Sequence, residues 1–169
     1  MTAAIYPIIP EQYVKEKTRQ LFGMTPVRVP LPKTMPKVGV ILIDDPFGGR
    51  HPIDSGNMRE YASRTCSSNP KSWLADKITR RLTGIIAPDY RADGEKTLRN
   101  LEDNPRWRET RAEVLQRLPE CDIRFVEVTN KFHRTLLISY IASIVCPPKS
   151  KSLRAISVKE LERLELMRK

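Results

Sequence analysis

The distribution of proline restricts the fold of this chain more than any other feature of its sequence. Eight of the fourteen prolines fall within residues 1–52 of the 169-residue chain. Proline fixes its own φ, restricts the residue before it and removes a backbone hydrogen-bond donor. We therefore expect neither a long helix nor a central sheet strand in the first third of the chain.

Two short elements fit between these prolines. A helix is expected from residue 10 or 11 to residue 22, with Gly23 as its stop. The apolar run Val38–Ile43 is the one strand candidate, and Asp44-Asp45-Pro46 interrupts it. The sequence shows no obvious partner strand. The run is therefore expected to pack as an apolar loop or to join the sheet of another protein, and residues 1–56 to form a wrapping arm.

From residue 69 onward the pattern is helical. Apolar residues at steps of three and four, with proline or capping residues at the ends, predict helices over 71–83, 106–118 and 122–145. Shorter helices are expected around 93–101 and from Ser157. The predicted fold is mainly α: a small helical bundle (69–148) with a long, extended, Pro-rich N-terminal arm (1–68) and a C-terminal linker and helix (149–169).

The net charge of +10 would suit a polyanionic partner. However, the excess of basic over acidic residues is spread evenly, at three in residues 1–50, three in 51–100 and four in 101–169. A nucleic-acid footprint is usually a block or a stripe. Nucleic acid is therefore the less favoured partner, and protein surfaces are preferred.

Two features indicate a reducing compartment and a peripheral relation to any membrane. The three cysteines, Cys66, Cys121 and Cys146, are isolated and fit neither a disulfide framework nor a metal knuckle. The N-terminus lacks the pattern of a secretory signal. The longest strongly apolar stretch, Thr135–Val145, is far shorter than the roughly 20 residues of a membrane-spanning helix.

No catalytic constellation is evident in the sequence. His51 and His133 are far apart and lack metal-ligand spacing, and Gly48-Gly49-Arg50 lacks the spacing of a phosphate loop. The pair Asp44-Asp45 before proline is typical of a turn rather than of a metal site. We expect no enzyme activity, no catalytic residue, no metal, no cofactor and no small-molecule substrate.

The segment Asn104–Glu120, which ends in Arg117-Leu118-Pro119-Glu120, resembles the signature of the small ubiquinol-binding-protein subunit of mitochondrial respiratory complex III. Lys71-Ser72-Trp73-Leu74 resembles the early Trp-Leu helix of that family. The resemblance covers residues 70–169, although Ala92-Asp93-Gly94-Glu95 and Cys146-Pro147-Pro148 depart from the family pattern. It implies an all-helical subunit on the matrix side, without a redox centre, that braces cytochrome b against the core proteins.

The sequence thus leads to three hypotheses. The preferred one is a non-catalytic accessory subunit of a mitochondrial inner-membrane respiratory complex, peripheral on the matrix side, with protein subunits as partners and anionic lipid as a further contact. The alternatives are a mitochondrial ribosomal protein that binds rRNA through its basic surface and arm, and a small helical adaptor outside mitochondria. The residues expected to contact partners are Val38, Val40, Ile41, Leu42, Trp73, Trp107, Arg117, Arg124, His133 and Arg134.

Overall fold

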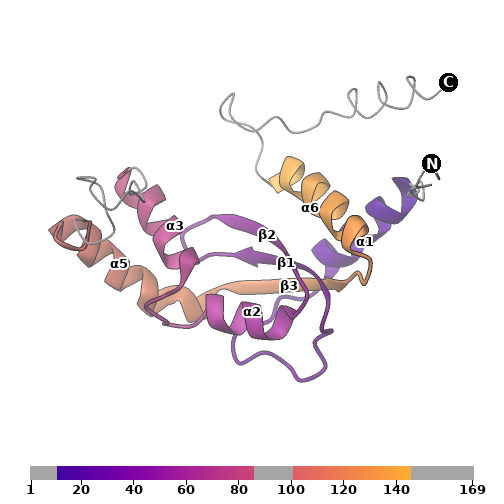
Figure 1. The fold of residues 1–169 in the computed structure, drawn as a ribbon, viewed down its shortest axis with the longest axis horizontal. Coiled ribbons are helices and arrows are strands. Elements are labelled where there is room, and N and C mark those ends of the chain that lie inside the picture. Colours follow the sequence, from indigo (N-terminus) through magenta and orange to yellow (C-terminus); the bar gives the residue numbers. More distant parts are fainter. Residues whose placement is uncertain (1–10, 86–100, 146–169) are drawn as a thin grey trace, which may run out of the picture.

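The computed structural model describes residues 11–85 and 101–145 (Figure 1). Within these ranges the chain is mixed α/β. The elements, in chain order, are α1 (Glu11–Gly23), β1 (Gly39–Asp44), β2 (Arg50–Ser55), α2 (Met58–Thr65), α3 (Trp73–Thr83), α5 (Pro105–Arg117), a 3-10 turn (Leu118–Glu120), β3 (Asp122–Glu127) and α6 (Lys131–Val145). The three strands form one antiparallel sheet in the order β2-β1-β3.

The prediction of a mainly helical bundle is therefore wrong. The run at residues 38–43 is a strand as expected, but it is the central strand of a sheet made by this chain alone. β1 pairs with β2, where Ile41 faces Ile53, and with β3, where Ile41 faces Phe125. β1 fits between Pro36 and Pro46, so the many prolines flank a central strand rather than excluding one.

The two edges of the sheet are occupied differently. Along β3, Val27 exchanges two backbone hydrogen bonds with Ile123, of 2.9 and 2.8 Å, so the segment after α1 covers the start of that edge. β2 forms the other edge and contains Pro52, which has no N–H to donate. A proline in an edge strand disfavours pairing with another chain. The expectation that residues 38–43 join the sheet of another protein is therefore not supported.

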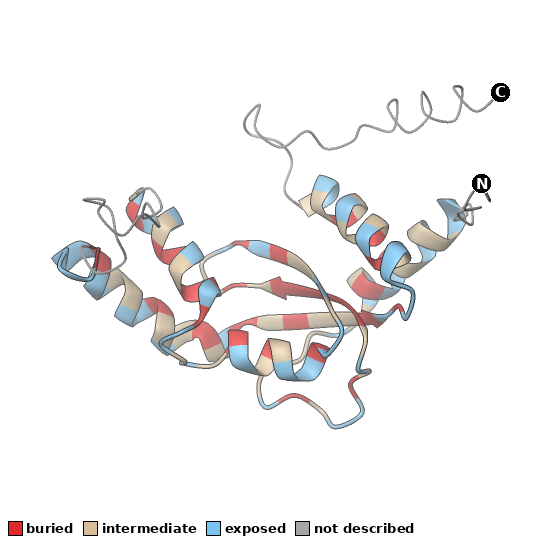
Figure 2. Ribbon diagram, viewed as in Figure 1, coloured by how far each residue is buried: buried red, intermediate tan, exposed pale blue. Residues whose placement is uncertain are grey.

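Each face of the sheet is covered by helices, because β1 alternates its side chains between two cores (Figure 2). Ile41 and Ile43 point into the larger core, which also contains Met58, Leu74 and Ile78 from α2 and α3. Val40 and Leu42 point into a smaller core beneath α1 and α6. All six residues of β1 are buried or nearly so, which explains its uninterrupted apolar sequence.

Three predicted helices are confirmed, and the reasons are local. α1 begins at Glu11 and ends at Gly23. In α3 the hydroxyl of Ser72 accepts a bond from the Ala75 amide and Gly84 ends the helix at a φ of 70°. In α5 Asn104 caps the first turn ahead of Pro105.

The single helix expected over residues 122–145 is wrong in its first part. Residues 122–127 form β3, and the helix α6 begins at Lys131. The all-helical fold that the family resemblance implied is corrected at the same place, because a strand follows Arg117-Leu118-Pro119-Glu120 directly. The helix expected around 93–101, except for Leu101, and the helix expected from Ser157 lie outside the described residues.

Candidate functional site

The side of α6 that faces away from the sheet is largely exposed (Figure 2), and we call it the α6 outer face. Its members follow the helical spacing of residues 132, 135, 136, 139 and 143, with Ile144 beside them. Phe132 is 44% exposed and Ile144 49% exposed. No charged residue occurs from Thr135 to Val145, although 30% of the whole chain is charged.

The hydroxyl groups on this face are already used within the helix. Thr135 donates to the carbonyl of Lys131, Ser139 to that of Thr135 and Ser143 to that of Tyr140, over 3.2, 3.0 and 2.7 Å. A hydroxyl has one donor. The α6 outer face therefore presents no spare hydroxyl donor at these positions and behaves as an uncharged surface of apolar side chains and small hydroxyl residues.

α6 is fixed at its beginning by the link from β3. The Arg134 guanidinium, which is 9% exposed, donates to the carbonyls of Val128 and Thr129 over 3.1 and 2.7 Å. The Asn130 side chain accepts from the amides of Phe132 and His133. These bonds satisfy backbone groups at the start of the helix and orient Leu137 and Ile141 toward the sheet.

α1 lies beside α6 and covers the rest of the smaller core. The ring of Tyr13 lies 5.2 Å from that of His133, and Lys17 lies over Tyr13 at 5.9 Å from its ring centre. Leu21 is fully buried against the sheet. One flank of α6 is thus covered by α1, and the α6 outer face remains exposed.

The β1–β2 hairpin contains a buried polar network around Asp45, whose side chain has no exposed surface. His51 Nε2 lies 2.7 Å from one carboxylate oxygen of Asp45, and Arg81 donates to the other over 2.9 Å. The amides of Phe47 and Gly49 donate to the same carboxylate over 2.8 and 3.1 Å. A Cβ at Gly49 would lie 1.8 Å from an Arg81 nitrogen, so only glycine permits this approach.

The electrostatics of Asp45 follow from these partners. Burial alone would raise the pKa of its carboxyl group, but the hydrogen bonds from His51, Arg81 and the two amides outweigh burial and lower the pKa to about 2. The ionised carboxylate therefore holds the hairpin closed and ties it to α3 through Arg81. His51 Nδ1 is buried and has no hydrogen-bond partner among the described residues. In this conformation, a substrate in solution does not reach the imidazole ring.

The sequence did not single out His51 for a structural role. The structure places it in β2, 4% exposed, beside the pair Asp44-Asp45. Asp45 does form the expected turn, since its carboxylate accepts from two amides of the loop. The signal that was available is Gly48-Gly49 directly after the strand candidate, since paired glycines are typical of a hairpin turn.

The expected partner-contact residues are dispersed over the molecule. Val40, Ile41, Leu42 and Trp107 are fully buried, and Val38 is half-buried. Arg124 pairs with Asp44 and donates to the Met24 carbonyl, while Arg117 pairs with Glu120 and lies 4.8 Å from the Phe47 ring centre. Trp73 is 37% exposed. His133 and Arg134 support the inner side of α6, so the structure does not bring these ten residues into one surface.

Cys66 and Cys121 face each other in the larger core, both fully buried. A hydrogen bond with Cys121, together with burial, raises the pKa of the Cys66 thiol. The Cys66 thiol therefore stays protonated, and both cysteines act as core side chains. Within residues 11–85 and 101–145, no group of three or more His, Cys, Asp or Glu side chains could hold a metal ion.

No helix in the described part of the chain is long and apolar enough to cross a membrane. No protein-family model matches the sequence, and neither a curated protein nor a solved structure shows significant similarity to the chain.

Proposed function

We propose that this chain is a non-catalytic subunit of a larger assembly, and that the α6 outer face is where another protein subunit packs. The observation that carries the proposal is the neutral surface from Thr135 to Ile144 in a chain that is otherwise densely charged. Exposed patches that lack charge are typical of protein–protein contacts. The small side chains of Ser139 and Ser143 would allow the backbone of a partner helix to approach closely.

The assembly to test first is a mitochondrial respiratory complex, with complex III preferred and the chain peripheral on the matrix side. Support comes from the resemblance in Asn104–Glu120 alone, because the all-helical fold of that family is absent here. Cytochrome b and the core proteins would then be the neighbours, and anionic lipid a further contact.

A mitochondrial ribosomal protein is the second candidate, and a specific observation favours it. No acidic residue occurs between Glu16 and Asp44, whereas five basic residues do. Such a run suits contact with the phosphates of rRNA. The segment 24–38 of this run passes beneath α2 (Figure 1), where Leu31 and Met35 are buried in the larger core. Its basic residues Arg28, Lys33 and Lys37 are exposed.

The test is to express the tagged chain in its native cells, solubilise membranes in mild detergent and identify co-migrating proteins by mass spectrometry. The variant Ser139→Arg places a charge in the centre of the α6 outer face. Ser68→Arg is the matched control, since it adds the same charge to an exposed loop between α2 and α3.

The proposal predicts that wild type and Ser68→Arg migrate with large partners and that Ser139→Arg migrates alone while remaining folded. Nuclease treatment separates the candidate assemblies, since it would release the chain from a ribosome and not from a respiratory complex. A Ser139→Arg chain that migrates with the same partners as wild type would refute the role of the α6 outer face.

A further inference from the structure

The outward side of α3 combines an aromatic ring with several cations. Trp73, Lys77, Arg80 and Arg81 recur at the spacing that places side chains on one helix face, and Lys71 precedes them. The opposite side of α3 is buried in the larger core through Leu74, Ala75, Ile78, Thr79 and Thr83. We call Lys71, Trp73, Lys77 and Arg80 the α3 basic face.

Among the described residues, no ion pair neutralises Lys71, Lys77 or Arg80 of this face. The one acidic residue of α3, Asp76, is engaged by Arg111 over 2.8 Å, and Arg81 is engaged by the buried Asp45 over 2.9 Å. The Nε of Arg80 is buried without a hydrogen-bond partner among the described residues. The net charge of each third of the sequence does not reveal this cluster of cations, because the helical spacing within α3 is what brings them together.

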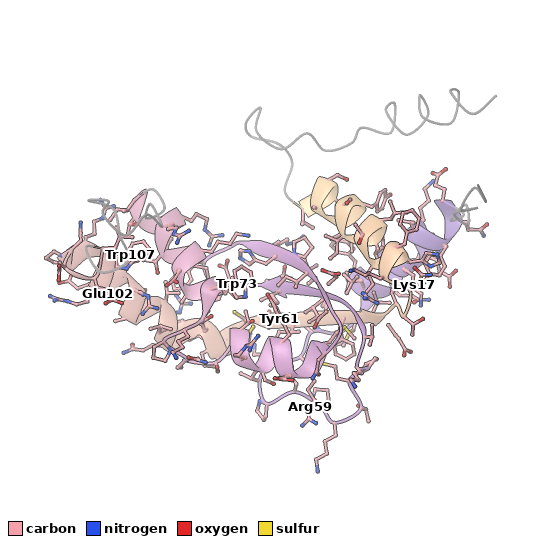
Figure 3. The ribbon with its side chains drawn as sticks, viewed as in Figure 1. Lys17, Arg59, Tyr61, Trp73, Glu102 and Trp107 are labelled. Carbon is pink, nitrogen blue, oxygen red and sulfur yellow. The ribbon has the colours of Figure 1, made fainter. Side chains whose placement is uncertain are left out.

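The orientation of the Trp73 ring is fixed by its neighbours, while 37% of the residue stays exposed. Trp73 lies beside the side chain of Tyr61, and the His51 ring meets the indole edge-on with centroids 6.4 Å apart. Lys77 Nζ lies 5.6 Å from the ring centre. Figure 3 shows Trp73 and Tyr61 at the junction of α2 and α3. An exposed indole held in one orientation offers a preformed stacking surface.

We propose that the α3 basic face binds single-stranded nucleic acid, with Trp73 stacking on a base and Lys77 and Arg80 contacting the flanking phosphates. Proteins that bind single strands combine these two elements, an aromatic platform and a cationic track. A lipid surface would require further apolar side chains around Trp73, whereas the outward positions 77, 80 and 81 are all cationic. The inference concerns a surface distinct from the α6 outer face, so either proposal can fail without the other.

The experiment titrates the full chain into a fluorescein-labelled oligouridylate of about 12 nucleotides, and fluorescence anisotropy is recorded at several salt concentrations. The double variant Lys77→Gln/Arg80→Gln removes two phosphate contacts. It should reduce the slope of log K against log salt by about 1.4, since each contact with a single strand contributes about 0.7. The control Arg106→Gln/Arg108→Gln removes the same charge from exposed positions on α5 and should leave the slope unchanged.

Trp73→Leu should weaken binding roughly tenfold without altering the slope, because the variant loses a stacked base but keeps every phosphate contact.

A second readout does not depend on this variant. Trp107 is fully buried, so a change in tryptophan emission when wild type binds the oligonucleotide would come from Trp73. Unchanged emission, or an equal loss of slope in the α5 control, would overturn the proposal. So would binding to vesicles of phosphatidylcholine and phosphatidylserine without binding to the oligonucleotide, which would assign the face to a membrane.

Discussion

The two helical layers of this molecule differ in how completely they are built. The layer of α2, α3 and α5 covers the larger core and is tied to the sheet by the Asp45 network at the hairpin. The layer of α1 and α6 covers a smaller core and has a neutral outer face. The first layer thus packs on the larger core and is anchored to the hairpin, whereas the second leaves an uncharged outer surface that a partner could cover.

This difference indicates where stability and association should reside. Changes in the first layer should lower the free energy of unfolding, because buried contacts and paired charges are lost there. Changes on the α6 outer face should leave that free energy nearly unaltered and should instead affect assembly.

Neighbouring residues of β1 test the two cores directly, since Ile41 points into the larger core and Leu42 into the smaller one. Ile41→Ala should cost about 4 kcal/mol and Leu42→Ala about 3 kcal/mol, because the thinner α1/α6 layer can relax further into the space created. Denaturant melts followed by circular dichroism measure both values. A larger loss for Leu42→Ala would show that the α1/α6 layer is the more tightly packed one.

The next largest loss of stability should come from disrupting the Asp45 network. Asp45→Ala removes the acceptor for His51, Arg81 and two amides, and should cost about 3 kcal/mol because buried donors lose their partner. Glu113→Ala is the control, because Glu113 is an exposed carboxylate on α5. Chemical denaturation of both variants is the measurement. If both lost equally little stability, the network would not anchor the hairpin.

The pH dependence of stability gives a smaller effect with a defined sign. The pKa of Asp45 is lowered from an ordinary value of 3.8 to about 2 in the folded chain, so its contribution is complete above about pH 4 and is lost as the pH falls toward 2. The contribution amounts to about 2 kcal/mol. In Asp45→Asn this part of the acid dependence should disappear. A wild type and variant with parallel stability profiles between pH 4 and 2 would contradict the assignment.

The sequence predicts helices α1, α3 and α5 well because their signals are local: caps, a first-turn proline, a final glycine and apolar spacing within each segment. The strands β2 and β3 escape prediction for different reasons. β2 is a polar edge strand that contains Pro52. β3 precedes α6 so closely that Phe125, Val128 and Phe132 extend the helical spacing backward into a strand.

The candidate sites show the same limit. The neutrality of Thr135–Val145 is visible in the sequence, but its exposure depends on which side of α6 the sheet covers. The partnership of Asp45 with His51 and Arg81 requires a hairpin and a helix 36 residues away in sequence to meet. Val40, Ile41 and Leu42 were expected to contact partners because no strand was predicted to pair with them; β2 and β3 supply that pairing.

The smallest effect on stability should come from Ser139→Arg on the α6 outer face. Ser139 is exposed and bonds only within its own helix, so the substitution should change the free energy of unfolding by less than about 0.5 kcal/mol. The same substitution should abolish co-migration with large partners, since an arginine buried at an uncharged contact would have no counter-charge. Thermal melts and native electrophoresis on one preparation measure the two quantities together. A loss of several kcal/mol would show that the surface is needed for the fold of the chain itself, and the contrast between the two layers would then fail.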